Sequence, residues 1–552
     1  MKTLRNLTLN RNLKSLLASV VAVLGASLSL AGCSDRHSAA LHGKYGGTLE
    51  LVGGDDIRSL DPAVAYDLPA WGVERTLYSG LLDYDDKANL IPMAATRWEI
   101  SPDGKTYTFH LRHDMHFEGP LTHNRLVTSQ DFAYEIGRVL DPKTGSSGFD
   151  FFSTILGADA FKEKKSKTVS GLVTPDLYTL VVHLKAPKPE FLNIMAMPFA
   201  YAVPHEVVEK YGAADFPEHA ESYGPFKLGF WRRNVDIQLD RNPHYWIKGV
   251  PFLDHIHERF GMGDLNSMMM FETGELGLSS IPPPDFVRIT HNPKFANLTV
   301  KQPAMTIYYL SMNCEMPPFN DVRVRQAVNY AINRERVLKL LNNRGALATG
   351  VLPPGMPGAD DPTLKGYSYD PAKARQLLKE AGHPEGFSSV LWVRSSDGAG
   401  TEMQQAQSIQ QDLEAVGIHV QLKPVTFSVW LTAVSKEGHV PMSMNRWVMD
   451  FPDPSDFLDV LLNSKQARKD EGNNNAFYKS PAMDALLNRA GSMLDPAKRL
   501  DLYRQANRLA VHDAPWVFLY YPVDYQLHQP WVHGFKLHPV WPALYEKIWL
   551  SG

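Results

Sequence analysis

The chain has 552 residues, of which 44% are hydrophobic and 21% are charged, and its formal net charge is −4 at pH 7. Residues 1–32 hold four basic and no acidic side chains, so the charge of the remainder is −8. A mildly acidic chain without a basic tract lacks the electrostatic footprint of a nucleic-acid-binding protein. Its length allows about two to four domains with ordinary hydrophobic cores.

The first 32 residues have the layout of a secretory signal peptide. A basic stretch that includes Lys2 and Arg5 precedes an apolar run over residues 16–30. That run is shorter than the roughly 20 residues that a membrane-spanning helix needs. It ends in Leu-Ala-Gly-Cys, which resembles the lipobox of bacterial lipoproteins. We therefore expect acylation of Cys33 and anchoring to a membrane by lipid; the alternative is an ordinary cleaved signal peptide with a cysteine nearby.

Strand patterns dominate the first part of the folded body, and capped helices dominate the second. Small and polar residues over 33–47 predict a tether, and alternating patterns predict strands at 48–52, 106–111, 180–184 and 235–239. After residue 320 we predict a helix from Asp321 through Val337, one after the cap Asp370, and one over 401–416 followed by a strand at 418–422. This succession of helices and strands predicts an α/β fold.

Several short motifs occur along nearly the whole mature chain. They are Ser-Leu-Asp-Pro at 59–62, Trp-Glu-Ile-Ser-Pro-Asp-Gly-Lys-Thr-Tyr-Thr-Phe at 98–109, Tyr-Gly-Pro-Phe at 223–226, Arg-Asn-Pro-His-Tyr-Trp at 241–246, Pro-Phe-Asn-Asp-Val-Arg at 318–323 and Asp-Phe-Pro-Asp-Pro at 450–454. In this order they resemble the family 5 extracellular solute-binding proteins, the oligopeptide- and dipeptide-binding group. One departure is Glu-Gly-Pro-Leu at 118–121, where the family commonly has His-Asp-Gly-Thr.

The resemblance implies an α/β, two-lobed periplasmic-binding-protein-like fold (type II, cluster C) with an extra domain inserted in the first lobe. We expect a signal peptide at 1–32, a tether at 33–47, and the inserted domain at 86–197. Lobe I is expected at 48–85 plus 198–297 plus 516–552, and lobe II at 298–515. A ligand enclosed between the lobes fits the general preference of binding sites for clefts between domains, and closure of the lobes would bury it.

The resemblance also implies a function. We expect the substrate-binding component of an ABC transporter, which captures peptides and delivers them to the permease and ATPase subunits from the periplasm or cell envelope. We expect a monomer that needs no cofactor and is not an enzyme. The alternatives are another cargo on the same architecture, namely a nickel chelate, an oligosaccharide, an opine or a muropeptide, and a lipoprotein that acts as chaperone, adhesin or hydrolase.

Four residues are candidates for ligand binding. The family's aspartate that pairs with the ligand's α-ammonium corresponds to Asp450, although Asp450 could instead order the turn that follows it. Arg394, where a predicted strand ends, is the candidate for the ligand's carboxylate, or else a solvated arginine. Trp447 and Asn445 could supply a wall and an amide, and core packing is the alternative for Trp447.

Neither metal nor catalytic motifs emerge from the sequence. His110, His113 and His116 are spaced by three on a predicted strand, where such spacing points side chains to opposite faces, so we expect no metal site. The sequence contains no Gly-x-Ser-x-Gly elbow, His-Glu-x-x-His helix or phosphate loop.

Overall fold

A computed structural model describes residues 43–395, 401–435, 439–468 and 472–552. The predicted signal peptide and Cys33 lie outside these residues, so acylation of Cys33 stays a prediction. Residues 44–552 form one unit. None of the helices in the described ranges combines the length and the apolar character that crossing a membrane requires.

Lobe I is built on a four-stranded sheet in which side chains alternate between an apolar and a polar face. Leu49, Ile256 and Leu239 lie side by side in register on neighbouring strands, and all three are buried. Helix α2 (Leu68–Leu77) begins where the Asp67 carboxylate accepts a hydrogen bond from the backbone N–H of Ala70 at 2.9 Å. In spatial order the strands are β1 (Thr48–Val52), β10 (His255–Arg259), β9 (Asp236–Arg241) and β8 (Phe226–Arg232).

The inserted segment forms a second four-stranded sheet, all antiparallel, covered by helix α3 (Ser129–Leu140). Thr128 and Asp131 form a capping box that starts α3. In spatial order the strands are β4 (Ala95–Ile100), β5 (Thr106–Leu111), β7 (Thr179–His183) and β6 (Leu172–Asp176). Short helices of this region are α4 (Phe149–Phe152), α5 (Ala158–Lys162) and α6 (Phe191–Ile194).

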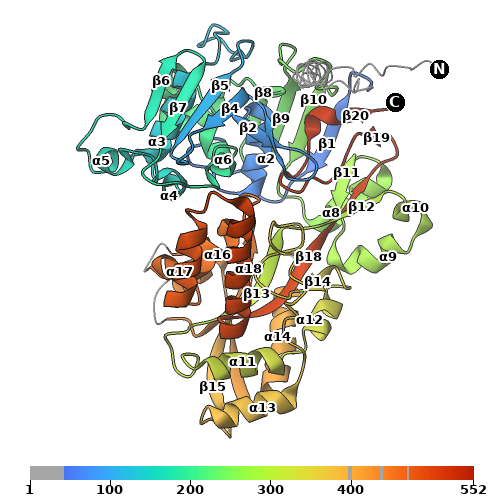
Figure 1. The fold of residues 1–552 in the computed structure, drawn as a ribbon. Coiled ribbons are helices and arrows are strands. Elements are labelled where there is room, and N and C mark those ends of the chain that lie inside the picture. The colour runs from blue at the N-terminus through green and yellow to red at the C-terminus, as the bar shows by residue number, and fades with distance from the viewer. Residues whose placement is uncertain (1–42, 396–400, 436–438, 469–471) are drawn as a thin grey trace, which may run out of the picture. The chain divides into compact units, whose positions relative to one another are not determined.

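An eight-stranded sheet forms lobe II and continues into lobe I through β18 (Trp516–His528). The path of hydrogen-bonded strands is β11 (Leu278–Ser280), β18, β13 (Thr306–Met312), β17 (Met442–Val448), β15 (Phe387–Arg394) and β16 (Ile418–Val425), and β12 (Thr299–Pro303) and β14 (Gly345–Leu347) also pair with β18. Figure 1 shows β18 as the long red strand that runs from the lobe II strands to β11 and β12.

β18 crosses between the predicted domains. Its first half pairs with β13, for example Tyr520 with Tyr308, and its second half pairs with β12, for example Leu527 with Thr299. The boundary predicted at residue 516 falls at the start of this strand and stays a prediction. Because β12 and β13 are consecutive, two antiparallel segments run from one lobe to the other, and the backbone N–H of Ala304 donates to the carbonyl of Pro522 at 3.0 Å where they meet.

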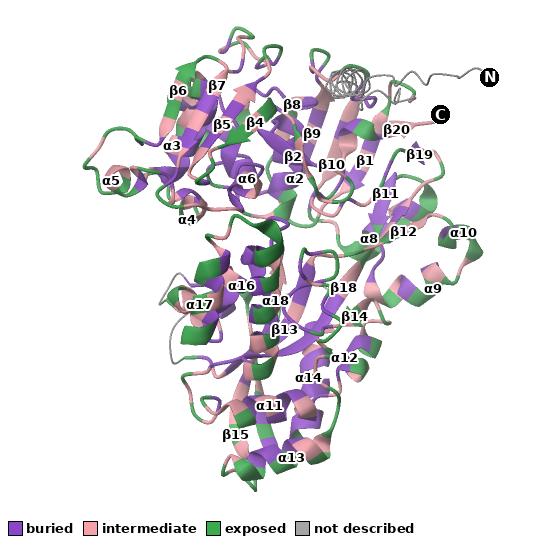
Figure 2. Cartoon of the chain, viewed as in Figure 1, coloured by how far each residue is buried: buried purple, intermediate pink, exposed green. Residues whose placement is uncertain are grey.

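Helices cover both faces of the lobe II sheet. On one face they share a core with residues such as Val328, Leu378 and Ile409, and on the other with Phe457, Leu487 and Tyr503. Figure 2 shows the buried stretches of these helices in purple and the exposed ones in green. The first group is α11 (Val322–Ala331), α12 (Arg334–Leu340), α13 (Pro371–Glu380) and α14 (Thr401–Glu414), and the second is α16 (Ser455–Leu462), α17 (Pro481–Ala490) and α18 (Pro496–Asp513).

Predicted helix ends were confirmed at two caps and were wrong at a third position. The carboxylates of Asp321 and Asp370 accept hydrogen bonds from backbone N–H groups in the first turns of α11 and α13. The helix predicted from Asp321 through Val337 is broken, because Ile332 is extended (φ −93°, ψ 124°) and Asn333 caps a new helix, α12. Apolar spacing continues across the break, so periodicity alone did not reveal it.

The remaining elements are short or peripheral. They are β2 (Leu82–Tyr84), β3 (Leu90–Pro92), β19 (Val532–His533), β20 (Trp549–Leu550), α7 (His205–Asp215), α8 (Asp264–Thr273), α9 (Phe286–Thr290), α10 (Pro293–Ala296) and α15 (Phe427–Val434).

Candidate ligand-binding cleft

A cavity of about 890 Å³ lies where the two crossing segments meet. Its walls come from the loop after β1, the start of α2, the end of β10, the strands β13 and β17, and the loop 537–545. We call this cavity the cleft. Its lining residues include Gly53, Tyr66, Glu258, Tyr308, Arg446 and Val448.

Strand β17 presents alternate residues to the cleft. Arg446 and Val448 line it, and their register partners on β13, Tyr308 and Thr306, line it with them. Successive side chains on a strand point to opposite faces, so Asn445 and Trp447 point away from that lining. Arg446 was missed by our sequence analysis, although its position one residue before Trp447 places it on the opposite face of the strand.

Asn445 and Trp447 make contacts within lobe II. Asn445 is buried, and its amide donates to the hydroxyl oxygens of Ser311 and Ser443, both at 2.9 Å. The Trp447 indole packs against the core beneath α16 to α18 and donates to Asp456 at 3.3 Å. Direct roles of Asn445 and Trp447 in ligand binding remain predictions, and these contacts favour core packing for Trp447.

Asp450 follows β17 directly and sits at the margin of the cleft. The hydroxyl of Tyr66, a lining residue from lobe I, donates to the Asp450 carboxylate at 2.6 Å. The turn after Asp450 is held by other groups, since Asp453 accepts from the backbone and hydroxyl of Ser455 and pairs with Arg499. The Asp450 carboxylate is therefore not required to cap this turn.

Burial raises the pKa of the Asp450 carboxyl group to about 7, against the opposing effect of hydrogen bonds from Tyr66 and Asp456. Burial, and then the charge of Asp450, also raise the pKa of Asp456. Asp456 accepts a hydrogen bond from the backbone N–H of Asp450 at 3.0 Å. Two carboxyl groups thus share one corner of the site, and a cation that entered it would relieve their repulsion.

Arg394 lies elsewhere. It forms an ion pair with Glu402, to which its backbone N–H also donates at 2.9 Å, and its guanidinium lies 5.3 Å from the ring centre of Trp430. It is 8% exposed and is not among the described residues that line the cleft. Its predicted role in binding a carboxylate stays a prediction. The strand end was visible in the sequence, but the pairing with Glu402 was not.

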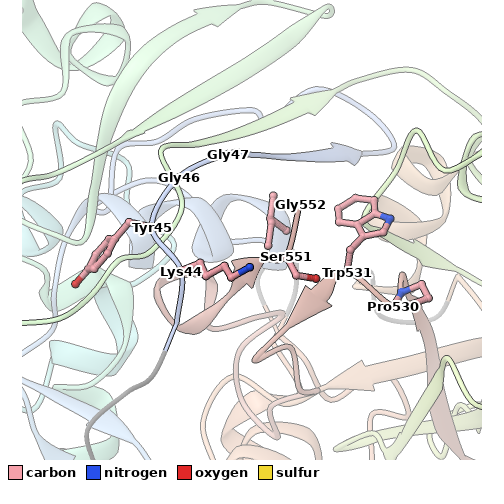
Figure 3. Close-up of a pocket in the computed structure, with 9 residues that line it drawn as sticks. Lys44, Tyr45, Gly46, Gly47, Pro530, Trp531, Ser551 and Gly552 are labelled. Atoms are coloured by element: carbon pink, nitrogen blue, oxygen red, sulfur yellow. The ribbon is translucent and has the colours of Figure 1, made fainter.

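A second hollow of about 830 Å³ lies beside the first described residues of the chain (Figure 3). Trp531 and Tyr45 supply its aromatic side chains, and Lys44 is the one charged side chain among the described residues that line it. Polar side chains do not converge there as they do in the cleft. Within the described ranges, no three His, Cys, Asp or Glu side chains are grouped to hold a metal ion.

A cleft between two α/β lobes, joined by two crossing segments, defines a receptor of the periplasmic-binding-protein type. The family model of the bacterial extracellular solute-binding proteins, family 5 (middle), matches residues 89–469. The chain belongs to this family. The resemblance stated from the motifs and the two-lobed α/β fold with an inserted domain are thereby confirmed.

Curated and solved relatives cover nearly all of the chain. The glutathione-binding protein GsiB of Shigella flexneri serotype 5b is 30% identical over 491 residues, which is 88% of this chain and 91% of GsiB. Periplasmic binding protein DppA from Helicobacter pylori, in complex with the peptide STSA, is 27% identical with a TM-score of 0.78, over 92% of this chain and 99% of DppA. AgaA from A. tumefaciens R10, in complex with agropinic acid, is 25% identical with a TM-score of 0.74, over 92% of this chain and 99% of AgaA.

Proposed function

We propose that this protein captures short peptides in the cleft and delivers them to the permease of an ABC importer. One observation carries the proposal: β17 has an open edge at the cleft. On one side β17 pairs with β13 along its whole length, but on the other it pairs with β15 only at Met442 and Ser443. Among the described residues no strand pairs with Asn445 to Val448 on that side. An extended peptide can add there as a strand through its backbone alone.

The peptide's α-ammonium is proposed to pair with Asp450, at the end of this edge. A peptide that runs antiparallel to β17 brings its first residue to that end. The Asp450 carboxylate, beside the carboxyl group of Asp456, offers the negative charge, and Tyr66 supplies a hydroxyl from the opposite lobe. Binding of the cation between the lobes favours the closed arrangement, because both lobes then contact the same group.

The ligand's carboxylate is proposed to meet a cation on lobe II. Arg446 lines the cleft four residues before Asp450, which corresponds to about 13 Å along a strand and suits a peptide of about three to four residues. Arg394 remains the earlier candidate for this role, and the two arginines are distinguished by experiment below.

The names of the relatives are consistent with this cargo and with one alternative. GsiB is named for glutathione, a small peptide, and DppA was solved with a tetrapeptide. AgaA holds agropinic acid, so a non-peptide amino-acid conjugate on the same architecture is the second candidate. We further propose a monomeric, non-enzymatic receptor in the cell envelope, anchored through acylated Cys33.

The test uses residues 34–552 without lipid, unfolded and refolded to remove carried ligand. Melting temperature is measured with di- to pentapeptides, nickel salts, oligosaccharides and opines. A ligand that binds only the native state raises the melting temperature by mass action. We expect a shift with tri- and tetrapeptides. A shift with opines, sugars or nickel alone would contradict the peptide proposal while keeping the fold.

A further inference from the structure

Glu258 occupies an unusual position in the wall of the cleft. It lies on β10 in register with Leu51 of β1 and Ile237 of β9, both buried. Ile256, two residues earlier on β10, is also buried, and so is Phe260, which directly follows the strand. Because side chains alternate along a strand, Glu258 shares the apolar face of the lobe I sheet with Leu51, Ile237 and Ile256.

The Glu258 carboxylate has no hydrogen-bond or ion-pair partner among the described residues. Burial alone raises its pKa to about 7. An unpaired carboxylate on an apolar face is costly for folding, and it is normally found only where a cation or a donor compensates it. The cleft is where such a group can reach Glu258, since Glu258 lines it.

The local backbone leaves room for the carboxylate. Gly53 lines the cleft beside it, and a Cβ atom on Gly53 would lie 2.3 Å from Glu258 Oε1. Any residue larger than glycine would therefore push the carboxylate aside. The rings of Phe260 and Tyr545 also line the cleft, and such rings suit the methylene stem of a long basic side chain while its head meets the carboxylate.

We propose that Glu258 is a specificity residue that selects peptides carrying a lysine or arginine side chain. This inference rests on the proposed capture of peptides. Asp450, on lobe II, receives the α-ammonium common to all peptides, and Glu258, on lobe I, receives a cation that only basic side chains supply. Charge-assisted hydrogen bonds of this kind are among the strong ones.

The test compares tripeptides of alanine with one lysine at the first, second or third position against matched peptides with norleucine, which has a similar stem and no charge. Arginine and citrulline form a second matched pair that separates guanidinium from ammonium recognition. Affinities are measured by calorimetry for the unmodified chain, Glu258→Gln and the matched control Asp450→Asn, each checked for a native melting transition.

We expect at least about tenfold tighter binding of the basic peptide than of its neutral match at one position or more. In Glu258→Gln this ratio falls to about one, and norleucine peptides bind at least as tightly as before, because no carboxylate is then left unpaired. In Asp450→Asn all peptides weaken and the ratio persists. An unchanged ratio in Glu258→Gln, or no ratio in the unmodified chain, overturns the inference but not peptide binding. Failure of every peptide to bind overturns the proposed function itself.

Discussion

The two walls of the cleft differ in the hydrogen bonds that their charged groups and their backbone make. In the lobe II wall, the last part of β17 has an open backbone edge. Asp450, just after this strand, forms hydrogen bonds with Tyr66 and Asp456. The lobe I wall includes the apolar face of a closed sheet, and on that face Glu258 stands without a described partner. The lobe II wall can bind the backbone and the α-ammonium, which all free peptides share. The lobe I wall can distinguish one side chain from another.

This contrast separates affinity from selectivity. Backbone pairing and a bound α-ammonium give binding that is indifferent to sequence. A desolvated carboxylate improves the binding free energy only of a ligand that brings a cation. A ligand without a cation leaves the carboxylate unpaired, which weakens binding. A receptor can therefore accept many peptides and still prefer some of them.

Removal of Arg394 should have the largest effect on stability. Arg394→Ala deletes the guanidinium that pairs with the buried Glu402, and loss of one partner from a buried pair costs about 3 kcal/mol or more. Urea denaturation measures the loss. At temperatures where the variant is folded, its peptide affinity should match that of the unmodified chain. A stable variant with selectively weakened binding of free carboxylates would instead support the original prediction for Arg394.

Neutralising Asp450 should give the largest loss of affinity. Asp450→Asn removes a charge-assisted hydrogen bond to the α-ammonium, and we expect about 100-fold weaker binding of free tripeptides, or about 3 kcal/mol. N-acetylated tripeptides, which lack the ammonium, serve as the matched ligands. They should bind weakly and equally to both proteins, and a loss of the same size for both ligand types would argue for a structural role of Asp450.

The same carboxyl group predicts a pH dependence of binding. An ammonium pairs with the ionised form, and the raised pKa of Asp450, about 7, means that this form is lost as pH falls through 7. Affinity should weaken up to about tenfold per pH unit below that point, a change that calorimetry at pH 8, 7 and 6 can follow. Asp450→Asn should flatten the profile.

Replacing Glu258 should stabilise the unliganded protein. Its folded-state pKa of about 7 exceeds the ordinary value of about 4.3, so the folded state holds the proton more tightly. The free energy of unfolding therefore falls as pH rises from about 4.3 to 7. Glu258→Met should raise it by about 1 to 3 kcal/mol at pH 8 and have little effect of this origin near pH 4.5. A loss of stability at pH 8 would show that Glu258 has a structural partner.

The smallest expected effect concerns Arg446. Arg446→Ala should weaken peptides with a free carboxylate about tenfold, or about 1.4 kcal/mol, while amidated peptides bind unchanged. Both affinities are measured at temperatures where the variant is folded, because Arg446 also has a partner within the chain. Equal losses for both ligand types would remove Arg446 as a carboxylate partner.

Local patterns predicted local structure well, and the motifs predicted the family. The caps Asp321 and Asp370 have short-range geometry, so four or five residues were enough to place them. The break at Ile332 and the pairing of Arg394 with Glu402 depend on tertiary contacts. Asp450 is a candidate that came from the resemblance. Glu258 was detectable in principle, as a charge between two apolar positions of one strand, but its neighbours Leu51 and Ile237 come from strands that only the fold brings together.

Hydrogen exchange along β17 tests the central claim most directly. The claim is that an extended peptide adds to the open edge between Asn445 and Val448. With a bound tripeptide, backbone amides in this stretch that face the open side should exchange at least about tenfold more slowly, and those already paired with β13 should change less. Saturating peptide that protects lobe I alone, or leaves β17 unchanged, would contradict strand addition and with it this account of the site.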